Sequence, residues 1–166
     1  MSTPTTKPED STDLSSDSEF EEYTQVIVHS WSKTLAALGF SLIPLFFLLD
    51  AVTMPRHLLK QFGMYRLLST AIVFTQYFVL HYTKPSRFSH LHGYFFTFIV
   101  GGVIAWMTHD LGGFDSSYYA GLNLVMIAVN MLLPWSVSNS VFNSLLVLGM
   151  YVSINAIAGQ AFHAAN

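Results

Sequence analysis

The sequence predicts an all-α protein, a polytopic transmembrane bundle of five helices behind an acidic N-terminal segment. Hydrophobic residues make up 52% of the chain and charged residues only 10%, whereas a soluble domain carries roughly 25% charged residues. Seven of the ten acidic residues lie within residues 1–22. The rest of the chain holds five apolar runs, each near the ~20 residues that a helix needs to cross a hydrocarbon core.

The N-terminal segment differs in composition from everything that follows. Residues 1–22 are rich in Ser, Thr, Pro, Asp and Glu and nearly lack large apolar side chains, so we expect a disordered acidic tail. Apolar residues at helical spacing from Tyr23 to Trp31 predict a short amphipathic helix over 23–33 that lies at the membrane interface.

Five apolar segments predict the transmembrane bundle over 34–160, at 34–53, 62–82, 91–108, 118–135 and 139–158. Pro44 lies inside the first segment and predicts a kink there. The connections are short, so helices that follow each other in the chain should be antiparallel neighbours. Strands are excluded because the runs are too long and show no alternation of period two.

The basic residues give a narrow prediction of orientation. With the N-terminus in the cytoplasm, four basic residues lie inside and three lie outside: Lys7, Lys33, Lys84 and Arg87 against Arg56, Lys60 and Arg66. This distribution favours a cytoplasmic N-terminus and an external loop over 109–117.

Composition and motifs exclude several classes of function. The chain contains no cysteine, which rules out disulfides, thiolate metal sites and cysteine nucleophiles. It has no basic patch, so we expect no nucleic-acid partner. No catalytic or phosphate-binding motif is present, and we therefore expect neither catalysis nor a cofactor in this chain.

Polar residues inside a membrane are costly and call for a partner or a function. Asp50 lies about one turn before the end of the first span and Arg66 about one turn into the second. The two residues are therefore at similar depth, and their side chains are expected to form an ion pair. Tyr119 and Asn123 are one helical turn apart and can converge on one cavity. A candidate ligand site in the outer half of the bundle therefore comprises Asp50, Arg66, His109, Asp110, Tyr118, Tyr119 and Asn123. The alternative is that these residues only fix the helices.

Other polar and small residues favour packing roles. A stripe of small or polar residues on the third segment predicts close helix contacts; its members are Tyr94, Thr97, Gly101, Ala105 and Thr108. Tyr119, Asn123 and Asn130 share one face of the fourth segment, and Ser144, Tyr151 and Asn155 share one face of the fifth. The asparagines are expected to form hydrogen bonds between helices, although two inward asparagines on the fourth segment are also compatible with a polar ligand cavity. The histidines at 81, 90 and 92 leave a membrane haem protein open as an alternative, and a small transporter or channel is another, although no inverted repeat is visible.

The most specific feature of the chain is the stretch 112–125, which reads Gly-Gly-Phe-Asp-Ser-Ser-Tyr-Tyr-Ala-Gly-Leu-Asn-Leu-Val, followed by Leu-Leu-Pro-Trp at 132–135. It resembles a segment of bacterial membrane sensor modules, with Ser117 in place of the usual proline. Ile-Pro-Leu-Phe at 43–46 and Asp50, Pro55 and Arg66 resemble the first hairpin of the same modules. More loosely, residues 34–160 are similar to the receptor region of autoinducer-sensing histidine kinases.

The resemblance implies a function as well as a fold. Such modules are input domains, joined through a helical linker to a class III adenylate/guanylate cyclase or to a histidine kinase. It implies a homodimer in the bacterial inner membrane that responds to a small apolar or amphiphilic signal. It also implies a sixth transmembrane helix, to which residues 161–166 would begin the connection, so we expect the native reading frame to continue.

Overall fold

The structure is a computed structural model that describes residues 11–86 and 88–157, and these residues form five α-helices and two 3-10 helices. The α-helices are α1 (Ser11–Thr53), α2 (Arg56–Tyr82), α3 (His90–Asp110), α4 (Ala120–Leu132) and α5 (Val137–Ile157). The 3-10 helices η1 (Gly113–Asp115) and η2 (Ser117–Tyr119) connect α3 to α4. The described part of the chain contains no strand, and the predicted all-α bundle of five helices is confirmed.

Three of the described helices are long and apolar enough to cross a membrane: α1 from Phe20 to Thr53, α3 and α5. The apolar segment Ser117–Leu132, which holds α4, is shorter. Helix α2 is long but opens with polar residues between Arg56 and Gln61. Membrane association therefore follows from three helices, and spans over α2 and α4 stay predictions.

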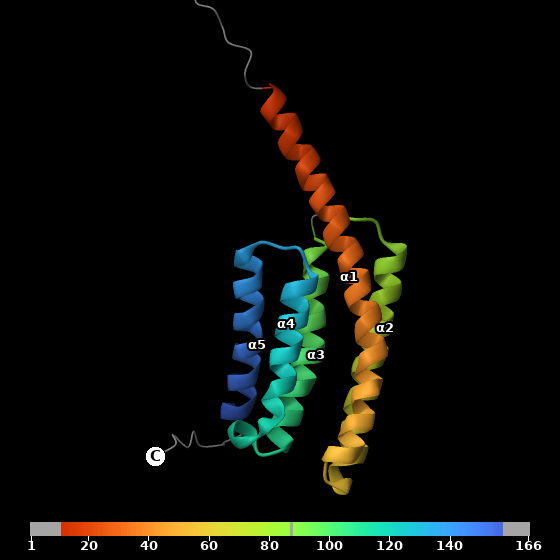
Figure 1. The fold of residues 1–166 in the computed structure, drawn as a ribbon, viewed down its shortest axis with the longest axis vertical. Coiled ribbons are helices and arrows are strands. Elements are labelled where there is room, and N and C mark those ends of the chain that lie inside the picture. Colours follow the sequence, from red (N-terminus) through yellow and green to blue (C-terminus); the bar gives the residue numbers. More distant parts are fainter. Residues whose placement is uncertain (1–10, 87, 158–166) are drawn as a thin grey trace, which may run out of the picture.

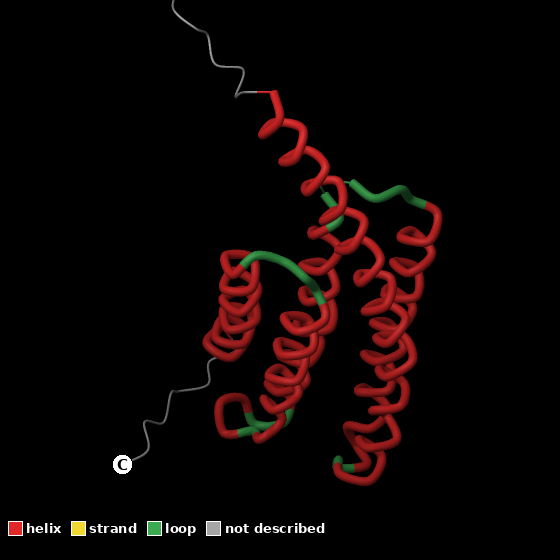
Figure 2. Tube along the Cα trace, turned by 45° about the horizontal axis from the view of Figure 1, so that its top comes forward, coloured by secondary structure: helices red, strands yellow, loops and turns green. Residues whose placement is uncertain are grey.

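The helices run up and down in succession, so their connections gather at two ends of the bundle (Figures 1 and 2). The α2–α3 and α4–α5 connections lie at one end, on the side from which α1 extends beyond the other helices. The α1–α2 and α3–α4 connections lie at the opposite end. This is the antiparallel arrangement that the short connections predict.

Helix α1 is longer than the sequence predicted. The prediction left residues 11–22 without structure and separated the helix over 23–33 from the first span, whereas one helix runs from Ser11 through Pro44 to Thr53. Acidic residues favour the N-terminal turns of a helix because they face the positive end of its dipole. Residues 1–10 and 161–166 lie outside the described residues.

The ends of α2 and α4 also differ from the prediction. Helix α2 begins at Arg56, directly after Pro55, and not at residue 62. Helix α4 ends at Leu132, before the predicted residue 135. The cause is Pro134, which disfavours helical geometry in the residue before it, and Leu133 indeed has extended backbone angles.

Helix α3 is the centre of the bundle, since it contacts each of the other four α-helices. Its predicted small-residue stripe is buried: Thr97, Gly101, Ala105 and Thr108 all face the interior. A Cβ atom built at Gly101 would lie only 3.1 Å from the Cε atom of Met150 on α5. The packing role that was predicted for this stripe is confirmed.

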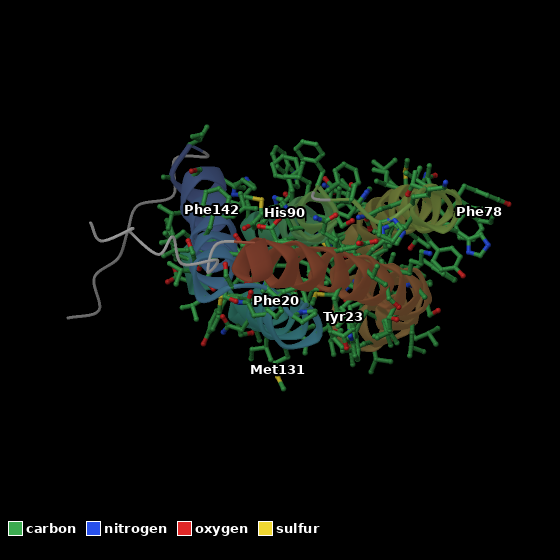
Figure 3. All side chains as sticks on the ribbon, turned by 90° about the horizontal axis from the view of Figure 1, so that it is seen from above. Phe20, Tyr23, Phe78, His90, Met131 and Phe142 are labelled. Carbon is green, nitrogen blue, oxygen red and sulfur yellow. The ribbon has the colours of Figure 1, made fainter. Side chains whose placement is uncertain are left out.

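The outer surface of the bundle is apolar, as a lipid-facing surface must be. Seen from above, Phe78 of α2, Met131 of α4 and Phe142 of α5 lie on different sides of the bundle (Figure 3). Their exposed fractions are 41%, 81% and 57%. Apolar side chains exposed on this scale are typical of a membrane contact and not of a water-exposed monomer.

Candidate functional site

The ends of α1 and α2 hold a buried ion pair. Asp50 lies in the last turn of α1, and Arg66 lies on the part of α2 that packs against it. The Arg66 Nε atom donates to Asp50 Oδ2 at 2.5 Å, and Nη2 donates to Oδ1 at 3.1 Å. Only 1% of Asp50 and 8% of Arg66 is exposed. The predicted pairing of Asp50 with Arg66 is present, in the two-pronged geometry that makes such pairs strong.

Tyr118 joins this ion pair from the α3–α4 connection. Its hydroxyl donates to Asp50 Oδ1 at 2.8 Å and accepts from Arg66 Nη2 at 2.6 Å. The Ser116 hydroxyl accepts the backbone N–H of Tyr118 at 3.2 Å and so fixes the start of η2. We call Asp50, Arg66 and Tyr118 the polar cluster. It ties three segments of the chain together without leaving a charge unpaired.

A sharp turn lets the α3–α4 connection reach the polar cluster, and aromatic rings surround the cluster. Gly112 and Gly113 have positive φ angles of 113° and 65°, a conformation that glycine adopts without strain. Aromatic rings cover the polar cluster. Phe62 is fully buried, and its ring centre lies 6.3 Å from that of Tyr118. The Phe46 ring centre lies 5.7 Å from the Arg66 guanidinium carbon. The cluster is therefore shielded by apolar groups as well as neutral overall.

His109 and Asp110 interact with residues outside the polar cluster. Asp110 Oδ2 accepts from Gln61 Nε2 at 2.9 Å, and the same nitrogen contacts the Tyr65 hydroxyl at 2.6 Å. The His109 ring lies beside Trp106, and its buried Nδ1 atom has no hydrogen-bond partner in the described part of the chain. Asp110 therefore connects α3 to α2 through Gln61, whereas the ring contact of His109 stays within α3.

Tyr119 and Asn123 face a separate groove between α4 and α5. The groove has a volume of about 820 Å³, and its walls are mainly apolar, formed by Leu122, Met126, Val141, Leu145 and Leu148 among others. Tyr119, Asn123, Ser140 and Ser144 supply polar groups to the same lining. Neither Tyr119 nor Asn123 has a side-chain hydrogen bond to another described residue. We call this space the α4–α5 groove; its free polar groups are available to a ligand.

Of the asparagines that were expected to bond between helices, Asn130 does so with α5, whereas Asn155 Nδ2 donates to the Tyr151 carbonyl within α5 and Asn123 has no side-chain partner among the described residues. Asn130 Nδ2 donates to the Ser144 hydroxyl at 3.1 Å, and Asn143 Nδ2 donates to Asn130 Oδ1 at 3.2 Å. Asn143 is fully buried. Asn143 was not among the residues predicted from the sequence.

A buried histidine that was not predicted from the sequence lies at the end of the bundle opposite the polar cluster. His29 on α1 is 3% exposed, and its Nε2 lies 3.0 Å from the Leu80 carbonyl, near the C-terminus of α2. Its Nδ1 lies 3.4 Å from the Ser89 hydroxyl. The last carbonyls of a helix lack partners within the helix, and His29 supplies one. A lone histidine in an interfacial segment carries no sequence signal for this contact.

The seven predicted site residues therefore separate into three groups. Asp50, Arg66 and Tyr118 form the polar cluster, and Tyr119 and Asn123 line the α4–α5 groove. Of the remaining two, Asp110 bonds to Gln61 on α2, and His109 contacts only the Trp106 ring on its own helix. Among the described residues, no three or more His, Cys, Asp or Glu side chains lie close enough to hold a metal ion.

Comparison with protein-family models, with curated proteins and with solved structures finds no match to this chain.

Proposed function

We propose that this chain is a membrane-embedded receptor domain that binds a small apolar or amphiphilic signal in the α4–α5 groove. The observation that carries the proposal is the presence of unpaired polar groups, on Tyr119 and Asn123, in a groove with otherwise apolar walls. Ligand sites combine mainly apolar linings with a few polar groups that orient the ligand. Val141, Leu145 and Leu148 of the groove lining are exposed on α5, a helix long and apolar enough to cross a membrane, so a signal dissolved in the bilayer meets this wall of the groove.

The polar cluster gives the groove a connection to the rest of the bundle. Tyr119 follows Tyr118 directly in η2, and Tyr118 bonds to Asp50 on α1 and to Arg66 on α2. A ligand that favours one position of η2 therefore biases the position of the α1–α2 hairpin. Such a shift requires a different affinity for the ligand in the two arrangements.

The output lies outside this chain in our proposal. The resemblance of residues 112–125 to bacterial membrane sensor modules supports an attached cytoplasmic nucleotide cyclase or histidine kinase, and a homodimer held by helices and linker. In this scheme the chain has no catalysis of its own. Its surroundings are the bacterial inner membrane, with the N-terminus in the cytoplasm.

The orientation is tested with two single cysteines in this cysteine-free chain. We expect Ser117→Cys, in the α3–α4 connection, to react with an impermeant thiol reagent in intact cells, and Ser86→Cys to react only after the cells are opened. Both positions are exposed. Labelling of position 86 alone in intact cells would reverse the proposed orientation.

The binding proposal is tested by photolabelling the full chain in phosphatidylcholine vesicles with a long-chain alkyl diazirine. We expect labelled peptides from α4 and α5, and less labelling there in Asn123→Leu, whereas Asn123→Gln should retain it. Thr75→Val is the matched control, because it removes an exposed polar group from α2. Uniform labelling of all lipid-facing helices, unchanged in Asn123→Leu, would contradict a site in the α4–α5 groove.

A further inference from the structure

The outer surface of α2 carries a second groove, at the end of the bundle where α1 turns into α2. It has a volume of about 740 Å³. Polar residues line one end of this α2 groove, namely His57, Lys60, Gln61 and Tyr65, and apolar residues line the other, namely Met64, Leu67, Leu68 and Ala71. The division between a polar head and an apolar body matches an amphiphile that stands parallel to the helix.

His57 and Lys60 line the polar end of the α2 groove, and Arg56 lies beside it, directly before His57 in the first turn of α2. Arg56, His57 and Lys60 are exposed, and none of them forms a hydrogen bond or ion pair with another residue of the described chain. The other polar groups are occupied, because Gln61 bonds to Asp110 and to Tyr65. Arg56 and Lys60 carry one positive charge more than the single carboxylate, Asp110, that contacts this groove through Gln61.

The start of α2 adds to this positive field. The helix begins at Arg56 after Pro55, with no side chain capping its N-terminus and no acidic residue in its first turn. The free N–H groups and the positive end of the helix dipole both favour a phosphate. A cationic first turn directly above an apolar groove is thus complementary to a phosphate attached to a hydrocarbon chain.

The length of the groove fits one lipid leaflet. Lys60 and Ala71 are eleven residues apart on α2, which corresponds to about 16 Å along a helix. One leaflet contributes about half of the ~30 Å hydrocarbon core. Met64, Leu67 and Leu68 are each more than 60% exposed along this length, so an acyl chain contacts them without displacing any protein side chain.

We propose that the α2 groove is a binding site for an anionic glycerophospholipid, whose phosphate contacts Arg56 and Lys60 and whose acyl chain lies along Met64, Leu67 and Leu68. The charge distribution favours an external position for Arg56, Lys60 and Arg66. Asp50 already neutralises Arg66, and the lipid site gives a role to the other two basic residues. It does not depend on the α4–α5 groove or on any signal bound there.

The test is lipid retention by the full chain, measured by native mass spectrometry after extraction from vesicles of equal phosphatidylglycerol and phosphatidylcholine. We expect the unaltered protein to retain phosphatidylglycerol in preference to phosphatidylcholine. The double variant Arg56→Gln, Lys60→Gln should lower this preference about thirtyfold, because each basic residue near an anionic lipid surface contributes about fivefold to the attraction. The control Lys33→Gln, Lys84→Gln removes two charges at the other end of the bundle and should leave the preference unchanged.

Two further arms separate a lipid site from simple charge attraction. Ala71→Trp fills the apolar end of the groove and keeps every charge, and it should also lower phosphatidylglycerol retention. An excess of glycerol 3-phosphate should not displace the lipid. Equal retention of the two lipids by the unaltered protein, equal losses in the test and control variants, full retention in Ala71→Trp, or displacement by glycerol 3-phosphate would each overturn the proposal.

Discussion

The polar cluster and the α4–α5 groove lie one residue apart in the chain, at Tyr118 and Tyr119, yet they satisfy their polar groups in opposite ways. In the polar cluster, every carboxylate oxygen of Asp50 accepts a hydrogen bond from Arg66 or Tyr118. In the groove, Tyr119 is 50% exposed, and it has no side-chain hydrogen-bond partner among the described residues. Two adjacent tyrosines thus differ in whether the protein itself has used their hydroxyl groups.

This difference separates anchoring from binding. A buried polar group that is fully paired holds helices in one arrangement and has nothing left to offer a ligand. A polar group that is unpaired in an apolar groove adds little to the fold, but it can recognise a molecule that enters the groove. Substitutions in the two regions should therefore affect different measurements.

The largest effect is expected from breaking the ion pair of the polar cluster. Arg66→Met leaves the Asp50 charge buried without its partner and should lower the free energy of unfolding by about 3–5 kcal/mol. The double variant Asp50→Leu, Arg66→Met removes both charges and should regain most of this loss. Unfolding in mixed micelles of increasing SDS content measures both. If Arg66→Met is as stable as the unaltered protein, the polar cluster is not an anchor.

The same chemical change at two neighbouring positions gives a smaller but sharper contrast. Tyr118→Phe removes two hydrogen bonds to charged groups and should lower the free energy of unfolding by about 1.5–3 kcal/mol. Tyr119→Phe removes a hydroxyl that has no such bonds, so the stability should stay unchanged while diazirine labelling of the groove falls. Equal free energies of unfolding for Tyr118→Phe and Tyr119→Phe would contradict the assignment of anchoring to one tyrosine and binding to the other.

The smallest effect is expected where α4 contacts α5. Asn130→Leu removes the bonds to Ser144 and Asn143 and should lower the free energy of unfolding by ~0.6–2 kcal/mol. Asn123→Leu lies two turns earlier on α4 and should leave the stability unchanged, because its amide has no side-chain partner in the described structure. A loss at Asn123 equal to that at Asn130 would make Asn123 a structural residue.

Much of the architecture could be predicted from the sequence because the relevant signals are local. The apolar runs define all five helices, and the short connections make them antiparallel. The ion pair between Asp50 and Arg66 was also accessible, since both residues belong to one hairpin and lie at similar depth. Pro134 would have given the correct end of α4 had its effect on Leu133 been applied.

Contacts between distant segments were not accessible in the same way. Tyr118 reaches Asp50 across 68 positions in the chain, and only the turn at Gly112 and Gly113 brings the two together. His29 likewise meets Leu80 and Ser89 because α1 packs along α2. Tyr118 and Tyr119 belong to different regions because of the orientation of η2. The sequence predicted only that the two residues lie at similar depth, and depth does not determine this orientation.

The short distance in sequence between Asp50 and Arg66 bears on how the chain enters the membrane. An unpaired charged residue within a membrane-spanning helix costs up to about 2.5–3.5 kcal/mol during insertion by the translocon, and most at the helix centre. Asp50 and Arg66 are separated by only 16 positions within the α1–α2 hairpin, so the hairpin can pair the two charges without any contribution from α3. If α2 crosses the membrane as predicted, the hairpin carries neither of these charges unpaired into the bilayer, and Tyr118 joins the ion pair once the α3–α4 connection is in place.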